Sequence, residues 1–153
     1  RQGEMMSPFL WVAFTDMLLS AQAKVGEGVE IGSVEGYKTR VMGTCYMDDS
    51  VWYSETRDEL QRRVEVQAAF CKFHAIKLNL DKCLYTFVPR RGDRGGVAPE
   101  PPSIGGKSAK AVPLDGYVKY LGMHISPTGN LKHEVGKLER KVMRVYDCLD
   151  RKQ

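Results

Sequence analysis

Two adjacent carboxylates, Asp48 and Asp49, stand between two runs of apolar, β-favouring residues. Like charges on neighbouring residues repel by about 1 kcal/mol even in water, and by more near a protein surface. No glycine or proline lies within four residues of the pair, so the doublet has little of the usual chemistry of a turn. A divalent cation would convert the repulsion into attraction, and the doublet is therefore a candidate metal site.

The two flanking runs predict a β-hairpin that carries the carboxylates at its turn. The first run extends from Tyr37 to Cys45 and the second from Val51 to Tyr53. Before the hairpin, glycines at both ends of residues 26–36 predict a turn-rich ribbon with a short strand at residues 29–31, which leads into one long strand ending at Asp48.

Two helices are predicted around this hairpin. Ser7 and Pro8 predict the start of the first, with Ser7 as its N-cap, and the apolar residues that follow keep helical spacing. Thr56 and Glu59 have the spacing of a capping box and predict a second helix that ends near His74. The charged side of the second helix predicts a solvated face without a binding site. Its residues are Arg57, Glu59, Arg62, Arg63 and Glu65.

A basic, proline- and glycine-rich stretch interrupts the second half of the chain at residues 89–113, after a predicted strand at 83–88. Its composition predicts a flexible insertion, with simple disorder favoured over contact with phosphate groups. Gly105-Gly106-Lys107-Ser108 is not a phosphate-binding loop, because the first glycine of that motif falls on Pro101.

The last third of the chain predicts a small hairpin and a long helix. Residues 117–126 are two short strand halves around Gly122, and a turn at 127–130 follows them. From Leu131 to Leu149, apolar residues recur at four- and three-residue spacing, which predicts a helix with an apolar packing seam. Basic residues lie away from that seam and favour either a solvated face or contact with a nucleic acid backbone.

Length and composition limit the possible domain organisation and partners of the chain. The chain has 153 residues, of which 42% are hydrophobic and 27% charged, and this is enough for one globular domain with a core. A net charge of +4 fits a polyanionic partner without requiring one. The four cysteines have no CxxC spacing, which favours reduced core thiols in an intracellular protein. No apolar run approaches the ~20 residues of a membrane span, so no membrane association is expected.

Taken together and in order, four motifs resemble the successive palm motifs of a reverse transcriptase over residues 1 to about 126. They are Arg1-Gln2-Gly3 with Ser7-Pro8, Tyr46-Met47-Asp48-Asp49, Leu78-Asn79 with Lys82, and Tyr120-Leu121-Gly122. The first and third are more similar to the branch of non-LTR retrotransposons, group II introns and retrons. The second motif instead resembles the retroviral sequence, because it has Met47 where the non-LTR branch usually has alanine.

The resemblance implies an RNA-directed DNA polymerase of a retroelement, which adds dNTPs to a DNA primer on an RNA template. In this family two Mg²⁺ ions, replaceable by Mn²⁺, are held by the hairpin carboxylate and by a further Asp from an earlier strand. Asp48 would be the direct metal ligand and Asp49 the supporting carboxylate. Further roles are implied for Gln2 and Gly3 on the nucleotide and template side, Lys82 near the incoming triphosphate, Tyr46 and Met47 at the primer end, and Tyr120, Leu121 and Gly122 as a grip on the primer.

The resemblance also implies an α+β fold, an antiparallel palm sheet with helices on one face. Residues 1–126 would form part of the palm, and the helix within 127–153 the start of a helical thumb. The family's first catalytic Asp and its fingers strands precede Arg1-Gln2-Gly3, so we expect a fragment that does not polymerise alone. Two alternatives stay open: an inactive retroelement remnant, and a nucleic-acid-binding module on a palm scaffold.

Overall fold

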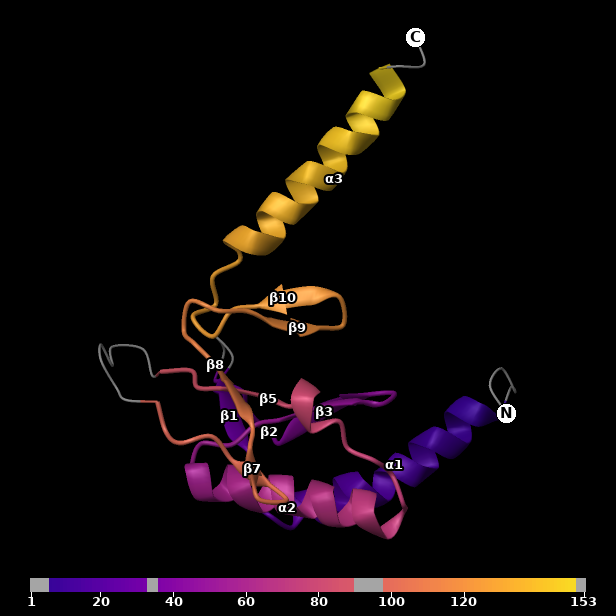
Figure 1. Cartoon of the computed structure of the whole chain (residues 1–153), viewed down its shortest axis with the longest axis vertical. Coiled ribbons are helices and arrows are strands. Elements are labelled where there is room, and N and C mark those ends of the chain that lie inside the picture. The colour runs from indigo at the N-terminus through magenta and orange to yellow at the C-terminus, as the bar shows by residue number, and fades with distance from the viewer. Residues whose placement is uncertain (1–5, 33–35, 90–97, 151–153) are drawn as a thin grey trace. The chain divides into compact units, whose positions relative to one another are not determined.

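The computed structural model describes residues 6–32, 36–89 and 98–150, and the chain forms two compact units. The first unit contains Arg1–Leu80 and Glu100–Ala109, and the second contains Asp81–Pro99 and Lys110–Gln153. Figure 1 labels the elements of both units along the chain. Each unit is described by itself below.

Two helices of equal length form the base of the first unit, α1 (Ser7–Ala23) and α2 (Arg57–Phe73), and they pack against each other. Helix α1 begins at Ser7 itself, with Met6 in the cap position and no capping side chain, so the predicted Ser7 cap is wrong. Helix α2 begins as predicted, because the Thr56 side chain accepts a hydrogen bond from the Glu59 backbone N–H at 3.2 Å. The Glu59 carboxylate does not complete a capping box, since it bonds the Gly28 N–H and Arg63 instead.

The contact between α1 and α2 combines the aromatic pair Phe14–Phe70, with ring centroids 5.1 Å apart, and buried polar side chains. Gln22 and Arg63 are both fully buried, and each donates to the backbone carbonyl of the other, at 2.8 and 2.9 Å. The Arg63 guanidinium also bonds the Gly26 carbonyl, the Ser54 hydroxyl and the Glu59 carboxylate. The prediction of a solvated charged face is therefore wrong at Arg63, because four neighbouring groups replace the water that its guanidinium would otherwise need.

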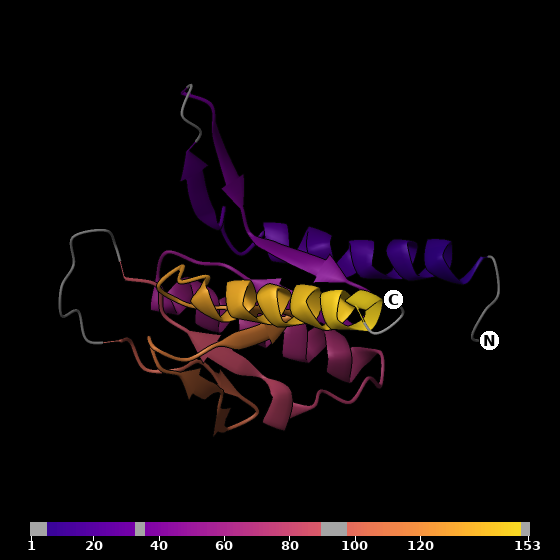
Figure 2. The ribbon, with the colours of Figure 1, turned by 90° about the horizontal axis from the view of Figure 1, so that it is seen from above.

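Three antiparallel ribbons complete the first unit. The pair β1 (Val29–Gly32) and β2 (Lys38–Val41) confirms the predicted ribbon, which Figure 2 shows extending away from α1. The pair β3 (Gly43–Tyr46) and β4 (Asp49–Trp52) confirms the predicted hairpin at the acidic doublet. Met42 separates β2 from β3, so the predicted single long strand is wrong. The third pair is β6 (Ser103–Ile104) with β7 (Lys107–Ser108).

The third ribbon lies within the stretch that composition predicted to be disordered. Helix α2 holds it: the Gln61 side chain exchanges two hydrogen bonds with the Ser103 backbone, at 2.8 and 3.0 Å, and Arg57 donates to the carbonyls of Glu100 and Pro101. The prediction of disorder is therefore wrong for residues 100–112, and residues 90–97 lie outside the described part of the chain.

The second unit combines a parallel strand pair, a hairpin and a helix. The short 3-10 helix η1 (Leu80–Lys82) leads into β5 (Leu84–Thr86), which pairs in parallel with β8 (Lys110–Val112). Strands β9 (Val118–Tyr120) and β10 (Met123–Ile125) form the predicted small hairpin. The predicted last helix is α3 (Lys132–Asp150), which Figure 1 shows running away from that hairpin.

Mixed helix and strand content agrees with the predicted α+β class, but the sheet differs from the expectation. Instead of one antiparallel sheet, the described residues form five separate two-stranded sheets, one of them parallel. Their strands are two to four residues long, and each pairs with a single partner.

Few side chains of the described residues are buried, and many large apolar ones are exposed. The buried hydrophobic residues are Leu18, Cys71, Tyr85 and Ala109. The predicted seam of α3 lies open, with Val135, Leu138 and Val142 about half to two-thirds exposed at 49%, 60% and 62%. No helix within the described ranges has both the length and the apolar character needed to cross a membrane.

Candidate active site

The acidic doublet sits on the tight turn between β3 and β4. Tyr46 pairs with Asp49 across the hairpin, so Met47 and Asp48 alone form the turn. Met47 has a φ of 51°, a conformation that costs an L-residue roughly 1–2 kcal/mol. Asp48 is therefore at the tip of the turn and Asp49 is the first residue of β4, and both are exposed.

Helix α1 fixes this turn from one side. The Trp11 indole donates a hydrogen bond to the Met47 carbonyl at 2.8 Å, across 36 residues of sequence. A small depression of about 230 Å³ separates the helix from the hairpin, and its lining residues are Pro8, Trp11, Val12, Thr15, Cys45, Tyr46 and Met47. The hydrogen bond and the surrounding contacts hold the strained turn in place, since strain of this kind persists only where neighbouring groups enforce it.

Helix α2 fixes the other end of the hairpin. Trp52 on β4 donates through its indole to the Gln67 side chain at 3.2 Å, and Gln67 in turn bonds the Cys71 sulfur. The Trp52 ring lies directly over Gly43, where an added Cβ would come within 2.4 Å of it. Glycine is therefore required at this position of β3, because a side chain would push the ring off the strand.

The hairpin offers oxygen ligands, and hard oxygen ligands are those that Mg²⁺ prefers. Among the described residues, no third histidine, cysteine or carboxylate joins Asp48 and Asp49 to form a group of metal ligands. Cys45 does not supply a thiolate, since desolvation raises the pKa of its thiol above the ordinary value. The two carboxylates are thus suitable ligands for a divalent cation, but within the described residues they form an incomplete ligand set.

The remaining predicted site residues lie elsewhere. Lys82 is exposed at the end of η1, and Tyr120, Leu121 and Gly122 form the tip of the β9–β10 hairpin in the second unit. Gln2 and Gly3 lie outside the described residues. The structure thus places Tyr46 next to the acidic turn on the first hairpin. Tyr120 lies with Leu121 and Gly122 on a different hairpin.

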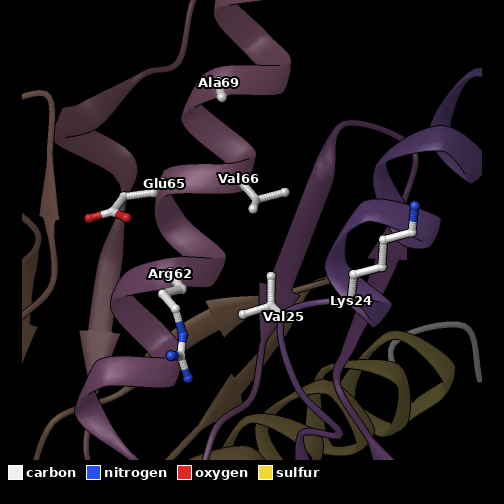
Figure 3. A pocket seen from close by; sticks show the side chains of 6 residues that line it. All are labelled: Lys24, Val25, Arg62, Glu65, Val66 and Ala69. Carbon is white, nitrogen blue, oxygen red and sulfur yellow. The ribbon is translucent and has the colours of Figure 1, made fainter.

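A second depression, of about 530 Å³, lies between the end of α1 and the outer side of α2. Figure 3 shows Lys24 and Val25 on one side of it, and Arg62, Val66 and Ala69 on α2 on the other. It contains a single carboxylate, Glu65, beside two cationic side chains, so it has no donor set for a metal ion. The acidic hairpin remains the candidate active site.

Trp11 is the positioning residue that sequence reasoning missed. Its spacing in the first helix marks it only as one of several apolar residues. The contact with Met47 joins residues 36 positions apart, and no local pattern signals such a contact.

Two comparisons with known proteins match this chain. Residues 1–125 match the family described as reverse transcriptase (RNA-dependent DNA polymerase). The chain is also 27% identical over 134 residues to the retrovirus-related Pol polyprotein from type-2 retrotransposable element R2DM of Drosophila melanogaster. That alignment covers 86% of this chain and 12% of the Drosophila protein, so the chain spans a small part of its relative's length. No solved structure matches the chain.

Proposed function

This chain belongs to the reverse transcriptase (RNA-dependent DNA polymerase) family, and we propose that it is a palm segment of a retroelement RNA-directed DNA polymerase. Its similarity to a retrotransposon polyprotein supports the non-LTR type. The proposed reaction is the addition of a dNTP to the 3′ hydroxyl of a DNA primer on an RNA template.

The observation that carries this proposal is the acidic turn of β3–β4, placed within the family match and fixed by both helices. Phosphoryl transfer depends almost entirely on positioning and on stabilising charge. Asp48 at the tip would ligate the catalytic ions directly, and Asp49 would support it from β4. Bound Mg²⁺, or Mn²⁺ in its place, would supply charge stabilisation at the attacking and leaving oxygens.

The other motif residues would contact the nucleic acid and the nucleotide. Tyr46 and Met47 would lie at the primer end, and Tyr120, Leu121 and Gly122 would grip the primer strand. Lys82 would approach the incoming triphosphate, and Gln2 and Gly3 would line the nucleotide and template side. Lys82 is exposed, and Leu121 is 47% exposed. Their exposure supports contact of both side chains with nucleic acid or nucleotide.

A primer-extension assay tests the proposal in a longer retroelement polypeptide that contains these residues. Asp48→Asn keeps the size of the side chain and removes its charge, and we expect it to lower extension by at least about a hundredfold, the scale of losing one group that stabilises the transition state. Asp115→Asn is the matched control, since Asp115 is an exposed turn residue outside the motifs. Equal activity of the two variants would refute the catalytic role of Asp48.

For the 153-residue chain alone we propose weak Mg²⁺ binding and no primer extension. The reason is the absence of a third ligand beside Asp48 and Asp49 among the described residues. Isothermal titration with Mg²⁺ should give weak binding that is lost in Asp48→Ala. Salt-sensitive binding of an RNA/DNA hybrid with no effect of Mg²⁺ would instead favour the binding-module alternative.

We further propose that the protein acts inside the cell. Among the described residues, Cys45 and Cys71 have free thiols, which is the usual state of cysteine in a reducing compartment.

A further inference from the structure

A cluster of two histidines and a carboxylate lies in the second unit, where α3 begins beside β10. His124 comes from β10, and His133 and Glu134 come from the first turn of α3. Their ligand atoms all lie within 4.8 Å of one another. The His124 Nδ1 is 2.8 Å from the Glu134 Oε1, and the His133 Nδ1 is 3.8 Å from the same oxygen.

These distances are close to those of a tetrahedral metal site. Zn–N and Zn–O bonds of about 2.0–2.2 Å place two ligand atoms about 3.3 Å apart along a tetrahedral edge. The distances of 2.8 and 3.8 Å fall on either side of that value, each by about half an ångström. The third edge, between the two histidines, is no longer than 4.8 Å, so the three ligand atoms are already gathered at about the size of one ion's coordination shell.

The hydrogen bonding of the cluster also favours an ion. The His133 Nδ1 is buried and has no hydrogen-bond partner, although a buried ring nitrogen usually has one. The Glu134 carboxylate accepts a hydrogen bond from the backbone N–H of His124 at 2.8 Å, which holds it beside both imidazoles. The rings of His124 and His133 are already close, with centroids 4.4 Å apart.

We propose that His124, His133 and Glu134 form a binding site for a divalent transition metal of the Zn²⁺ class. Two imidazoles and one carboxylate are ligands that suit Zn²⁺, and they leave a fourth position for water. The site is separate in sequence and composition from the acidic turn, and it would join the first turn of α3 to the β9–β10 hairpin.

Lys137 is the cation that competes with a metal for Glu134. Its ammonium is 3.7 Å from the Glu134 Oε1 and donates to the Gly122 carbonyl at 2.8 Å. Because the shorter contact is to Gly122, Lys137 can keep that hydrogen bond while the carboxylate turns toward an ion. Tyr117 closes the other side, with its ring centroid 4.8 Å from that of His133.

Zn²⁺ titration of the 153-residue chain, followed by NMR of the histidine rings, tests the proposal. The chain has three histidines, so His74 in α2's cap position is an internal reference. We expect Zn²⁺ to shift the ring nitrogen signals of His124 and His133 and to leave those of His74 unchanged. Unmoved signals, or equal shifts at all three histidines, would overturn the proposal.

Matched variants measure the contribution of each ligand. His133→Gln and Glu134→Gln should each weaken Zn²⁺ binding by at least about tenfold, since even groups behind the direct ligands contribute that much. Glu139→Gln makes the same charge change as Glu134→Gln, at an exposed position of α3. This control variant should bind Zn²⁺ as tightly as the wild type does. Affinities of His133→Gln and Glu139→Gln within twofold of each other would overturn the site, as would binding carried entirely by the cysteine thiols.

Discussion

The two hairpins that carry family motifs have turns of the same length and different conformations. In β3–β4, Tyr46 pairs with Asp49, and in β9–β10, Tyr120 pairs with Met123, so each turn has two residues. Leu121 and Gly122 both have positive φ, at 48° and 81°, as type I′ turns require. In the acidic turn Met47 alone is left-handed, and Asp48 is not among the residues with positive φ.

Each turn has a carbonyl that accepts a hydrogen bond from a neighbouring helix, and the donors differ in charge. Trp11 on α1 bonds the Met47 carbonyl, and Lys137 on α3 bonds the Gly122 carbonyl, both at 2.8 Å. A neutral indole fixes the acidic turn without pairing with Asp48 or Asp49. An ammonium at that place would compete for the two aspartates, as Lys137 beside the second turn does for Glu134.

The largest predicted effect removes the buried support of the acidic hairpin. Arg63→Met should lower the free energy of unfolding by about 3–5 kcal/mol, because it leaves the Glu59 carboxylate and the carbonyls of Gln22 and Gly26 without their partner. Urea denaturation measures the loss, and amide exchange at β3–β4 should quicken, since α2 holds that hairpin through Trp52.

Arg62→Met is the matched control for this prediction. Arg62 is the exposed neighbour of Arg63 on α2, and its substitution should change stability by less than about 0.5 kcal/mol. Similar losses in the two variants would show that burial of the guanidinium does not support the hairpin.

The two turn anchors should respond differently to salt. Trp11→Phe removes the indole donor and should cost about 1 kcal/mol, equally at low and high ionic strength. Lys137→Met should cost less, a few tenths of a kcal/mol, and its cost should shrink as salt is added, because the lysine is partly exposed and near Glu134. Urea denaturation at two salt concentrations separates them, and a salt-sensitive Trp11 effect would contradict the comparison.

Acid should loosen the second hairpin through Glu134. The hydrogen bonds from His124 hold the pKa of Glu134 at about 2 in the folded chain, below the ~4.3 of an unperturbed Glu. A lowered pKa stabilises the fold above the unfolded value, and that stabilisation is lost as pH falls from about 4.3 through 2. With a chelator present, Glu134→Gln should flatten the dependence of stability on pH in this range, and an unchanged slope would refute the assignment.

Elements defined by local pattern could be predicted from the sequence. The ribbon after Gly28, the acidic hairpin, helix α2 and the hairpin at Gly122 were all predicted, because their signals lie within a few residues of each other. The end of α2 was also near its predicted place at His74, where Ala75 adopts a positive φ of 55° and the Ile76 N–H bonds the Cys71 carbonyl.

Features that depend on distant partners could not be predicted. The burial of Arg63 depends on Gln22, 41 residues away, and the same charge pattern on a helix without that partner would be solvated. The parallel pairing of β5 with β8 joins a strand before the basic stretch to one near the end of that stretch, and composition carries no information on such pairing. For the site, the acidic doublet was visible in the sequence, whereas its anchor Trp11 and the ligand cluster at His124 were not.

A small stabilising effect tests the strain in the two turns. Met47→Gly and Leu121→Gly each remove a side chain from a left-handed residue, and both side chains are about half exposed, at 55% and 47%. Glycine adopts positive φ without steric cost, so each change should raise stability by roughly 0.5–1 kcal/mol in urea denaturation. At Gly32, an open position with no positive φ, the reverse change Gly32→Ala should stabilise instead, so the sign of a glycine exchange should follow the backbone conformation. If Leu121→Gly stabilises and Met47→Gly does not, the contacts of Met47 in the depression beside Trp11 offset its strain, and the acidic turn is held by packing as well as by its hydrogen bond.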